Sequence, residues 1–145
     1  MNTIVLNTMT AAVTEYTNHD FDSITPTHAG SSLGLYAFGG DLDVAAPIVA
    51  NIVTGKTHWG ATLKKYVDIV FFAIKGEGTG RMTVFGEKTS YSYNFPIEQG
   101  GESRSKPGRG IRENYLAFGF SNPDGQDFQL DRIEAEVGQS GTRRT

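Results

Sequence analysis

The chain has 145 residues, of which 38% are hydrophobic and 20% are charged, so it is long enough for one globular domain and too apolar for a disordered tail. No run approaches the roughly 18 apolar residues of a membrane-spanning helix, and the first ten residues lack the basic and apolar segments of a secretory signal. The absence of cysteine excludes disulfides and thiolate chemistry, and the formal net charge of −3 gives no general attraction to nucleic acid or anionic lipid.

The N-terminal third indicates short strands and loops. Residues 4–17 are rich in Val, Thr and Ile, which favour a pleated surface over a helix, so we expect an extended arm over residues 1–10 followed by a strand. A loop over residues 19–32 follows, and strands are predicted over residues 33–38 and 46–55.

The middle of the chain contains the clearest strand signals. Residues 64–76 include the unbroken apolar run Ile69–Ile74, which predicts a strand covered on both faces. A helix over residues 60–74 is the alternative, because it would also gather apolar residues on one side. In residues 89–95 aromatic and small polar residues alternate, which is the period-two pattern of a half-buried strand, and residues 81–86 precede it through a hairpin turn.

The last two predicted strands enclose a polar turn. In residues 114–121 the side chains of Leu116, Phe118 and Phe120 share one face. The apolar residues of the final strand change parity between Leu130 and Ile133, which predicts a β-bulge near Asp131–Arg132.

Together these patterns predict an all-β fold of about eight strands, an antiparallel β-sandwich or jelly-roll-like barrel. We expect extended terminal arms and a long Gly/Arg-rich loop. The predicted organisation is an N-terminal arm over residues 1–10, a single domain over residues 11–137 and a flexible C-terminal tail over residues 138–145.

Three segments could in principle hold a ligand. The first supplies cation-binding oxygens from Asn122, Asp124, Asp127 and Asp131, but Gly125 comes too early for an EF-hand and "NPDG" has the chemistry of a type I turn. A strand follows the glycine run of residues 75–81, which predicts a hairpin loop there and not a phosphate-binding loop before a helix.

The third segment places His19 beside Asp20 and Asp22, without a second histidine at a ligand spacing. No nucleophile motif occurs along the chain. We therefore predict that the protein is not an enzyme and that it has no catalytic residue, cofactor or metal.

Residues 98–113 form a long polar segment with four basic residues among glycines. It is either a flexible hairpin loop or a segment that lies on a neighbouring subunit, where its cations would pair with acidic groups. The apolar N-terminus and the basic C-terminus suggest similar contacts. The candidate interface residues are Arg104, Lys106, Arg109, Arg112, Ile4, Leu6, Arg143 and Arg144.

A second kind of surface would use exposed aromatic rings to stack on sugars. Its candidates are Trp59, Tyr91 and Tyr93. A single Trp is more often a core or interface residue, so glycan binding remains the alternative interpretation.

The C-terminal sequence "KPGRGIRENYLAFGFSNPDGQDFQLDRIEAEV" resembles a pattern of small tailed-bacteriophage virion proteins. It combines a Gly-Arg-Gly turn, an aromatic strand and a closing hairpin, and the upstream segments "AVTEYTNHDFDSI" and "GLYAFGGDLD" are similar to the same group in the same order. The matched positions in the C-terminal part are Gly108, Arg109, Gly110, Arg112, Tyr115, Asp124, Gly125, Asp127, Phe128, Asp131, Ile133 and Glu134. The pattern departs from the family at Ala117, where a larger residue is expected, and in the apolar segment after "GDLD".

The resemblance implies a non-enzymatic β-sandwich subunit of the virion, in the tail or the distal tail apparatus, that is assembled in the host cytoplasm. Its partners would be copies of itself and other virion proteins, with no nucleic acid and no membrane. The alternatives are a head decoration protein and a carbohydrate-binding module that attaches to a host surface glycan.

Overall fold

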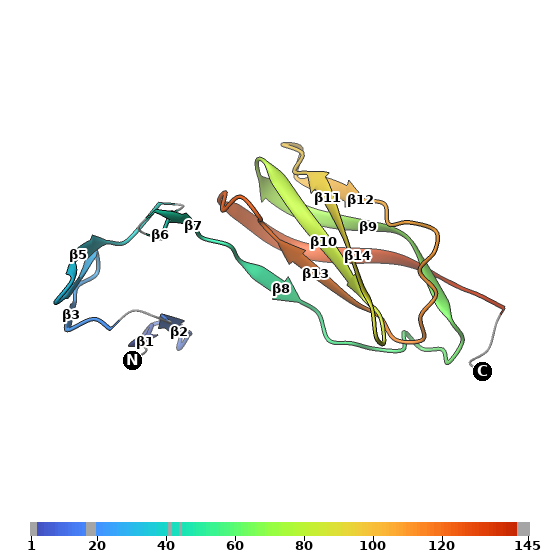
Figure 1. Ribbon diagram of the computed structural model, residues 1–145, viewed down its shortest axis with the longest axis horizontal. Helices are drawn as coiled ribbons and strands as arrows, with labels where there is room; N and C mark the ends of the chain where they lie inside the picture. The colour runs from blue at the N-terminus through green and yellow to red at the C-terminus, as the bar shows by residue number, and fades with distance from the viewer. Residues whose placement is uncertain (1–2, 17–19, 41, 44, 142–145) are drawn as a thin grey trace. The chain divides into compact units, whose positions relative to one another are not determined.

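The computed structural model describes residues 3–16, 20–40, 42–43 and 45–141 and divides the chain into two compact units, residues 1–40 and 41–145 (Figure 1). The described residues contain strands and no helix, and all strand pairs between them are antiparallel. The predicted all-β class is therefore confirmed, and the alternative helix over residues 60–74 does not form.

The N-terminal unit consists of two small sheets. Strand β1 (Thr3–Leu6) pairs with β2 (Val13–Tyr16), and β3 (Ser23–Ile24), β4 (His28–Ser31) and β5 (Gly34–Ala37) form a three-stranded sheet. Within the predicted extended arm over residues 1–10, residues 3–10 therefore form a strand and turn of a hairpin, and Asn7 closes the turn by accepting hydrogen bonds from the Met9 and Thr10 amides.

This unit buries few side chains. Ala29 is its one fully buried hydrophobic residue among those described, and Phe21 packs against Tyr36 and Phe38 at centroid distances of 5.9 Å and 6.3 Å. The boundary at residue 40 differs from the predicted single domain over residues 11–137, because the described strands before it pair only with one another.

The second unit starts with a short hairpin of β6 (Leu42–Asp43) and β7 (Ala46–Pro47). A four-stranded sheet follows in the order β11 (Ser90–Pro96), β10 (Thr79–Phe85), β13 (Ala117–Ser121), β8 (Asn51–Val53). A three-stranded sheet has the order β12 (Glu102–Ser105), β9 (Lys65–Gly76), β14 (Phe128–Gln139). The predicted strand over residues 46–55 is therefore two strands, and β14 extends past residue 137 into the predicted flexible tail.

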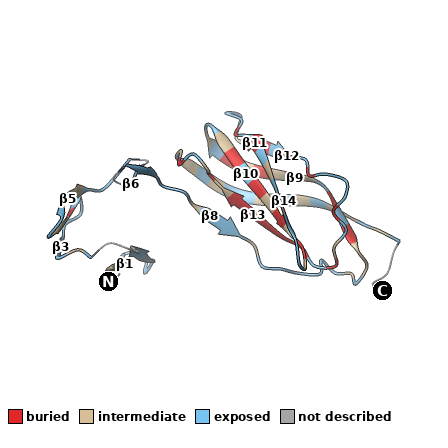
Figure 2. Ribbon diagram, in the orientation of Figure 1, coloured by how far each residue is buried: buried red, intermediate tan, exposed pale blue. Residues whose placement is uncertain are grey.

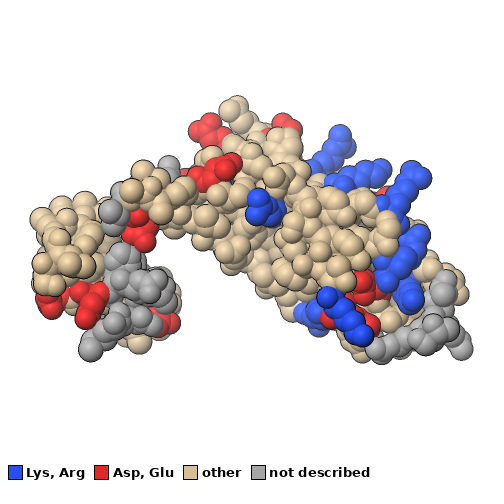
Figure 3. All heavy atoms as spheres, viewed as in Figure 1, with Lys and Arg blue, Asp and Glu red and all other residues tan. Residues whose placement is uncertain are grey.

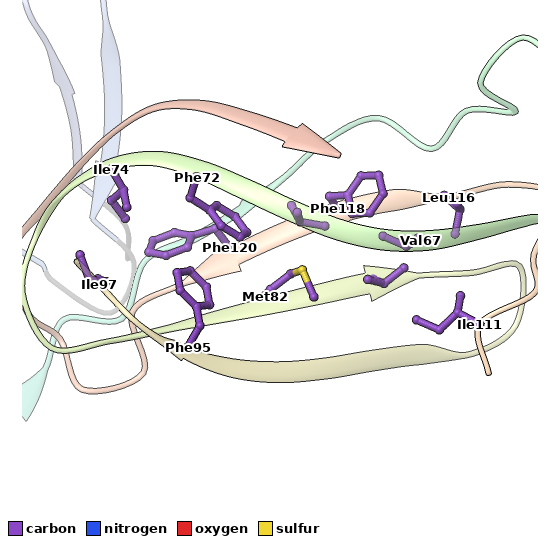
Figure 4. Packing of buried hydrophobic residues seen from close by; sticks show 12 residues of the cluster. Val67, Phe72, Ile74, Met82, Phe95, Ile97, Ile111, Leu116, Phe118 and Phe120 are labelled. Carbon is purple, nitrogen blue, oxygen red and sulfur yellow. The ribbon is translucent and has the colours of Figure 1, made fainter. Parts of the chain in front are cut away.

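Both sheets contribute side chains to one hydrophobic cluster (Figures 2 and 4). Phe72 of β9 stacks on Phe95 of β11 with ring centroids 4.7 Å apart, and Phe120 of β13 packs 5.8 Å from Phe72. The other members of the cluster are Val67, Val70, Ile74, Met82, Val84, Ile97, Ile111, Leu116 and Phe118. This cluster fixes the two sheets on each other and supplies the rigid part of the chain.

The prediction that Ile69–Ile74 is covered on both faces is wrong. Val70, Phe72 and Ile74 are fully buried, whereas the alternate residues Ile69, Phe71 and Ala73 are only half-buried. Within the described residues of the second unit no further layer covers the outer face of the three-stranded sheet, so an apolar run here does not mean two covered faces.

The predicted bulge in β14 is confirmed. Leu130 pairs with Ile74 and Arg132 pairs with Ala73, which leaves Asp131 as the extra residue. A second register shift between Glu136 and Val137 was not predicted. Its signal was present in β9, where the buried residues change parity between Val67 and Val70.

Candidate assembly surface

Part of the segment 98–113 is an edge strand. Residues 102–105 pair with β9, with Ser103 and Ser105 buried and Glu102 and Arg104 exposed. The Ser103 hydroxyl accepts a hydrogen bond of 2.8 Å from the Glu98 amide. The prediction of an unpaired loop is therefore wrong for these residues, because serine is small enough to fill the inward positions at the sheet edge.

The basic residues of this segment lie on its exposed side. Arg104, Lys106, Arg109 and Arg112 are exposed, whereas Pro107 and Ile111 between them are buried. The guanidinium carbon of Arg112 lies 5.1 Å from the centre of the Tyr66 ring, a cation–π contact that fixes this arginine over β9.

We call Arg104, Lys106, Arg109 and Arg112 the basic edge. Figure 3 shows Lys and Arg side chains gathered over β12 and the segment that follows it. Within the described residues no ion pair involves any of these four side chains, so their charge faces outward.

The other predicted interface residues lie in the terminal segments. Ile4 and Leu6 alternate on one face of β1 and are 69% and 58% exposed. Arg143 and Arg144 lie outside the described residues.

The three candidate glycan-binding residues pack against other residues of the second unit. Trp59 is 42% exposed, donates a hydrogen bond of 3.2 Å from Nε1 to the Leu116 carbonyl and packs edge-on against Phe118. Tyr91 and Tyr93 are half-buried and pack against the hydrophobic cluster. Most of their ring surface is therefore used in packing, which leaves little for stacking on a sugar.

The segment 122–125 forms the predicted turn, with the Gly125 amide 3.1 Å from the Asn122 carbonyl. Asn122 is 3% exposed, and its amide oxygen accepts a hydrogen bond of 2.6 Å from the Ala50 amide. Its amide nitrogen donates to the carbonyls of Gln126, at 2.8 Å, and Ile48. Asn122 therefore joins the turn to the segment between β7 and β8.

Replacing Asn122 by alanine is expected to lower the free energy of unfolding by about 2 kcal/mol, because three backbone groups around this buried side chain lose their hydrogen-bond partner. Urea unfolding followed by the fluorescence of Trp59 measures this change. Asp124→Ala in the same turn is the control, and its exposed side chain predicts a change within about 0.5 kcal/mol. An equal loss in both variants would contradict the structural role of Asn122.

The other sequence candidates do not come together as a site. The glycine run connects β9 to β10, but the predicted hairpin loop is wrong, because β9 and β10 belong to different sheets and do not pair. An open polar hollow of about 490 Å³ beside it is lined by Gly76, Glu77, Gln99, Gln126 and Asp127. Asp20 and Asp22 are exposed, and their neighbour His19 lies outside the described residues. No group of three or more His, Asp or Glu residues that could hold a metal occurs in the described part of the chain.

Comparisons of the chain with protein-family models, with curated proteins and with solved structures found no match. In the described ranges no helix is long and apolar enough to cross a membrane. The candidate surfaces are therefore interpreted from their own geometry and from the sequence resemblance.

Proposed function

We propose that the protein is a non-enzymatic structural subunit of a tailed-bacteriophage virion, assembled into the tail or distal tail apparatus through contacts with copies of itself and with other virion proteins. In this proposal residues 41–145 form a β-sandwich that serves as the rigid body. The resemblance of residues 106–137 to small virion proteins supports the biological setting.

One observation carries the assembly function: the described residues of the N-terminal unit form short strands but have almost no interior. Large apolar side chains are exposed on these strands and turns, including Leu33 and Leu35, which are 88% and 75% exposed. Figure 2 shows this unit as almost entirely exposed. Segments of about 40 residues rarely bury enough surface to be stable alone, and an isolated two-stranded hairpin is marginal in water. Contacts with a partner would supply the missing burial.

The proposal predicts that the full-length protein associates as its concentration rises. Sedimentation velocity over a dilution series measures the association, and Ile4→Asn/Leu6→Asn is expected to weaken it, because burial of such a side chain contributes about 1.5–3 kcal/mol. Thr89→Asn, at the exposed tip of the β10–β11 hairpin, is the matched control and should associate like the natural sequence. A protein that remains monomeric at every concentration would contradict the proposal.

The place in the virion is tested separately by electron microscopy of particles labelled with antibody against the chain. Label at the tail is the expected result. Label over the head would replace the tail assignment with a head decoration protein, and unlabelled particles would exclude a virion component.

A further inference from the structure

The charge of the chain is divided unevenly between its two units. Residues 1–40 contain three acidic residues, Glu15, Asp20 and Asp22, and no Lys or Arg. All 13 basic residues lie in residues 41–145, together with the 13 remaining acidic ones. The whole formal charge of −3 therefore belongs to the N-terminal unit, and Figure 3 shows no Lys or Arg atoms on it.

The same unit has an apolar face that includes one of these acids. In the β1–β2 hairpin, Ile4 lies opposite Glu15 and Leu6 lies opposite Val13. Residues directly opposite in an antiparallel pair project from the same face of the sheet, so Ile4, Leu6, Val13 and Glu15 share one face. Asp20 and Asp22 of the same unit are exposed, and the unit contains no Lys or Arg, so a surface that is partly apolar and positively charged would complement it.

The second unit has a surface of that kind. Residues 103–112 contain the four cations of the basic edge and no acidic residue. Arg104 lies directly opposite Phe71, and Phe71 is half-buried with Ile69 on the outer face of the same sheet. Glu134 lies on the other side of Phe71, but the side chain of Arg132 pairs with it at 2.7 Å. Residues 104–112 therefore carry only basic charge, and the exposed Glu102 lies just before them at the start of β12.

We propose that the N-terminal unit of one copy docks on the basic edge of a second copy. This inference rests on the proposed function and specifies its contact. The two surfaces are different, so the contact is head-to-tail, and each copy has one donor unit and one acceptor edge. Repetition of such a contact produces a closed ring or an open filament, and not a symmetric dimer.

The test uses charge reversal in the full-length chain. The donor variant is Asp20→Lys/Asp22→Lys, the acceptor variant is Arg104→Asp/Arg109→Asp, and a third protein combines all four changes. The matched control is Lys88→Asp/Asp124→Lys, which reverses two exposed charges elsewhere in the second unit. Circular dichroism of each variant checks that the strands are retained, and sedimentation velocity at low ionic strength measures association.

Donor and acceptor variants are each expected to associate about tenfold more weakly than the natural sequence, because attraction becomes repulsion at the contact. The four-position variant should recover most of the lost association. Such a recovery would not occur if the donor and acceptor variants had weakened association by unfolding the chain. The control should be unchanged, and added salt should weaken the natural assembly.

Association that is unaffected by both variants would overturn the head-to-tail contact and leave the proposed function intact. A natural chain that never associates would instead remove the proposed function. Variants that change thermal stability at a constant monomer mass would show that the two units meet within one chain, which overturns the inference. A short DNA duplex that binds the natural protein and not the acceptor variant, with assembly unchanged, would also overturn it.

Discussion

Replacing Phe72 by alanine is expected to lower the free energy of unfolding of residues 41–145 by about 4 kcal/mol, which is within the range for deleting a fully buried aromatic ring. Phe72 has no exposed surface, and its ring contacts the rings of Phe95 and Phe120 from the facing sheet. The substitution removes the central ring of this group and leaves a cavity between two sheets that each have further strands to hold them in place. Because the sheets are fixed at many points, the cavity cannot close.

Phe71→Ala is the matched control, since it removes the same side chain from the neighbouring residue. Phe71 is half-buried on the outer face, so a loss of about 1 kcal/mol is expected from the smaller area returned to water. Urea unfolding followed by Trp59, the single tryptophan and a residue of this unit, measures both changes. A similar loss of unfolding free energy in the two variants would contradict the assignment of Phe72 to the buried face of β9 and Phe71 to its outer face.

The strands that could be predicted are those whose large apolar side chains lie on one face and alternate with small or polar residues on the other. Period-two alternation located β11, β13 and β14, and the parity change in β14 located its bulge. These features follow from local sequence because alternation is the direct consequence of a covered and an uncovered face. The strands of the N-terminal unit are two to four residues long, which is too short to leave a period.

The edge strand β12 was missed for a different reason. Its sequence alternates charged and small residues, Glu102, Ser103, Arg104 and Ser105, so its period-two pattern consists of polar residues only. The inward positions at the edge of this sheet need only small side chains, so hydrophobicity gave no signal. The four basic residues of this segment were predicted to lie in a loop or on a neighbouring subunit, and they are exposed in the structure. The division of charge between the two units can be counted from the sequence alone.

The burial of one residue could not be predicted from these patterns. Lys65, the first residue of β9, is 1% exposed, and its ammonium group donates to the carbonyls of Ala61, Leu63 and Asn114 at 2.5, 2.8 and 3.0 Å. A lysine is usually exposed at its charged end, and no sequence pattern distinguishes one that is enclosed by carbonyls. The acceptors come from two segments, and Asn114 is 49 positions after Lys65, so the arrangement depends on the tertiary fold.

Replacing Lys65 by methionine is expected to lower the free energy of unfolding by about 3 kcal/mol, although methionine keeps most of the apolar stem. A hydrogen bond to a charged group contributes about 1.5–3 kcal/mol, and three of them are lost. The opposing term is the cost of burying an ammonium group, several kcal/mol, which the substitution removes. The balance remains unfavourable because three carbonyls are left in a buried site without their donor.

Lys64→Met is the control, because Lys64 is the preceding residue and only half-buried, so its expected change is within about 0.5 kcal/mol. Unfolding in urea measures both variants. Hydrogen exchange adds a local readout, since the Lys65 and Glu113 amides, each bonded to the carbonyl of the other, should lose protection in Lys65→Met. If Lys65→Met matched the natural protein in both measurements, the three carbonyl contacts would contribute nothing net, and β9 would be anchored at this end by backbone pairing alone.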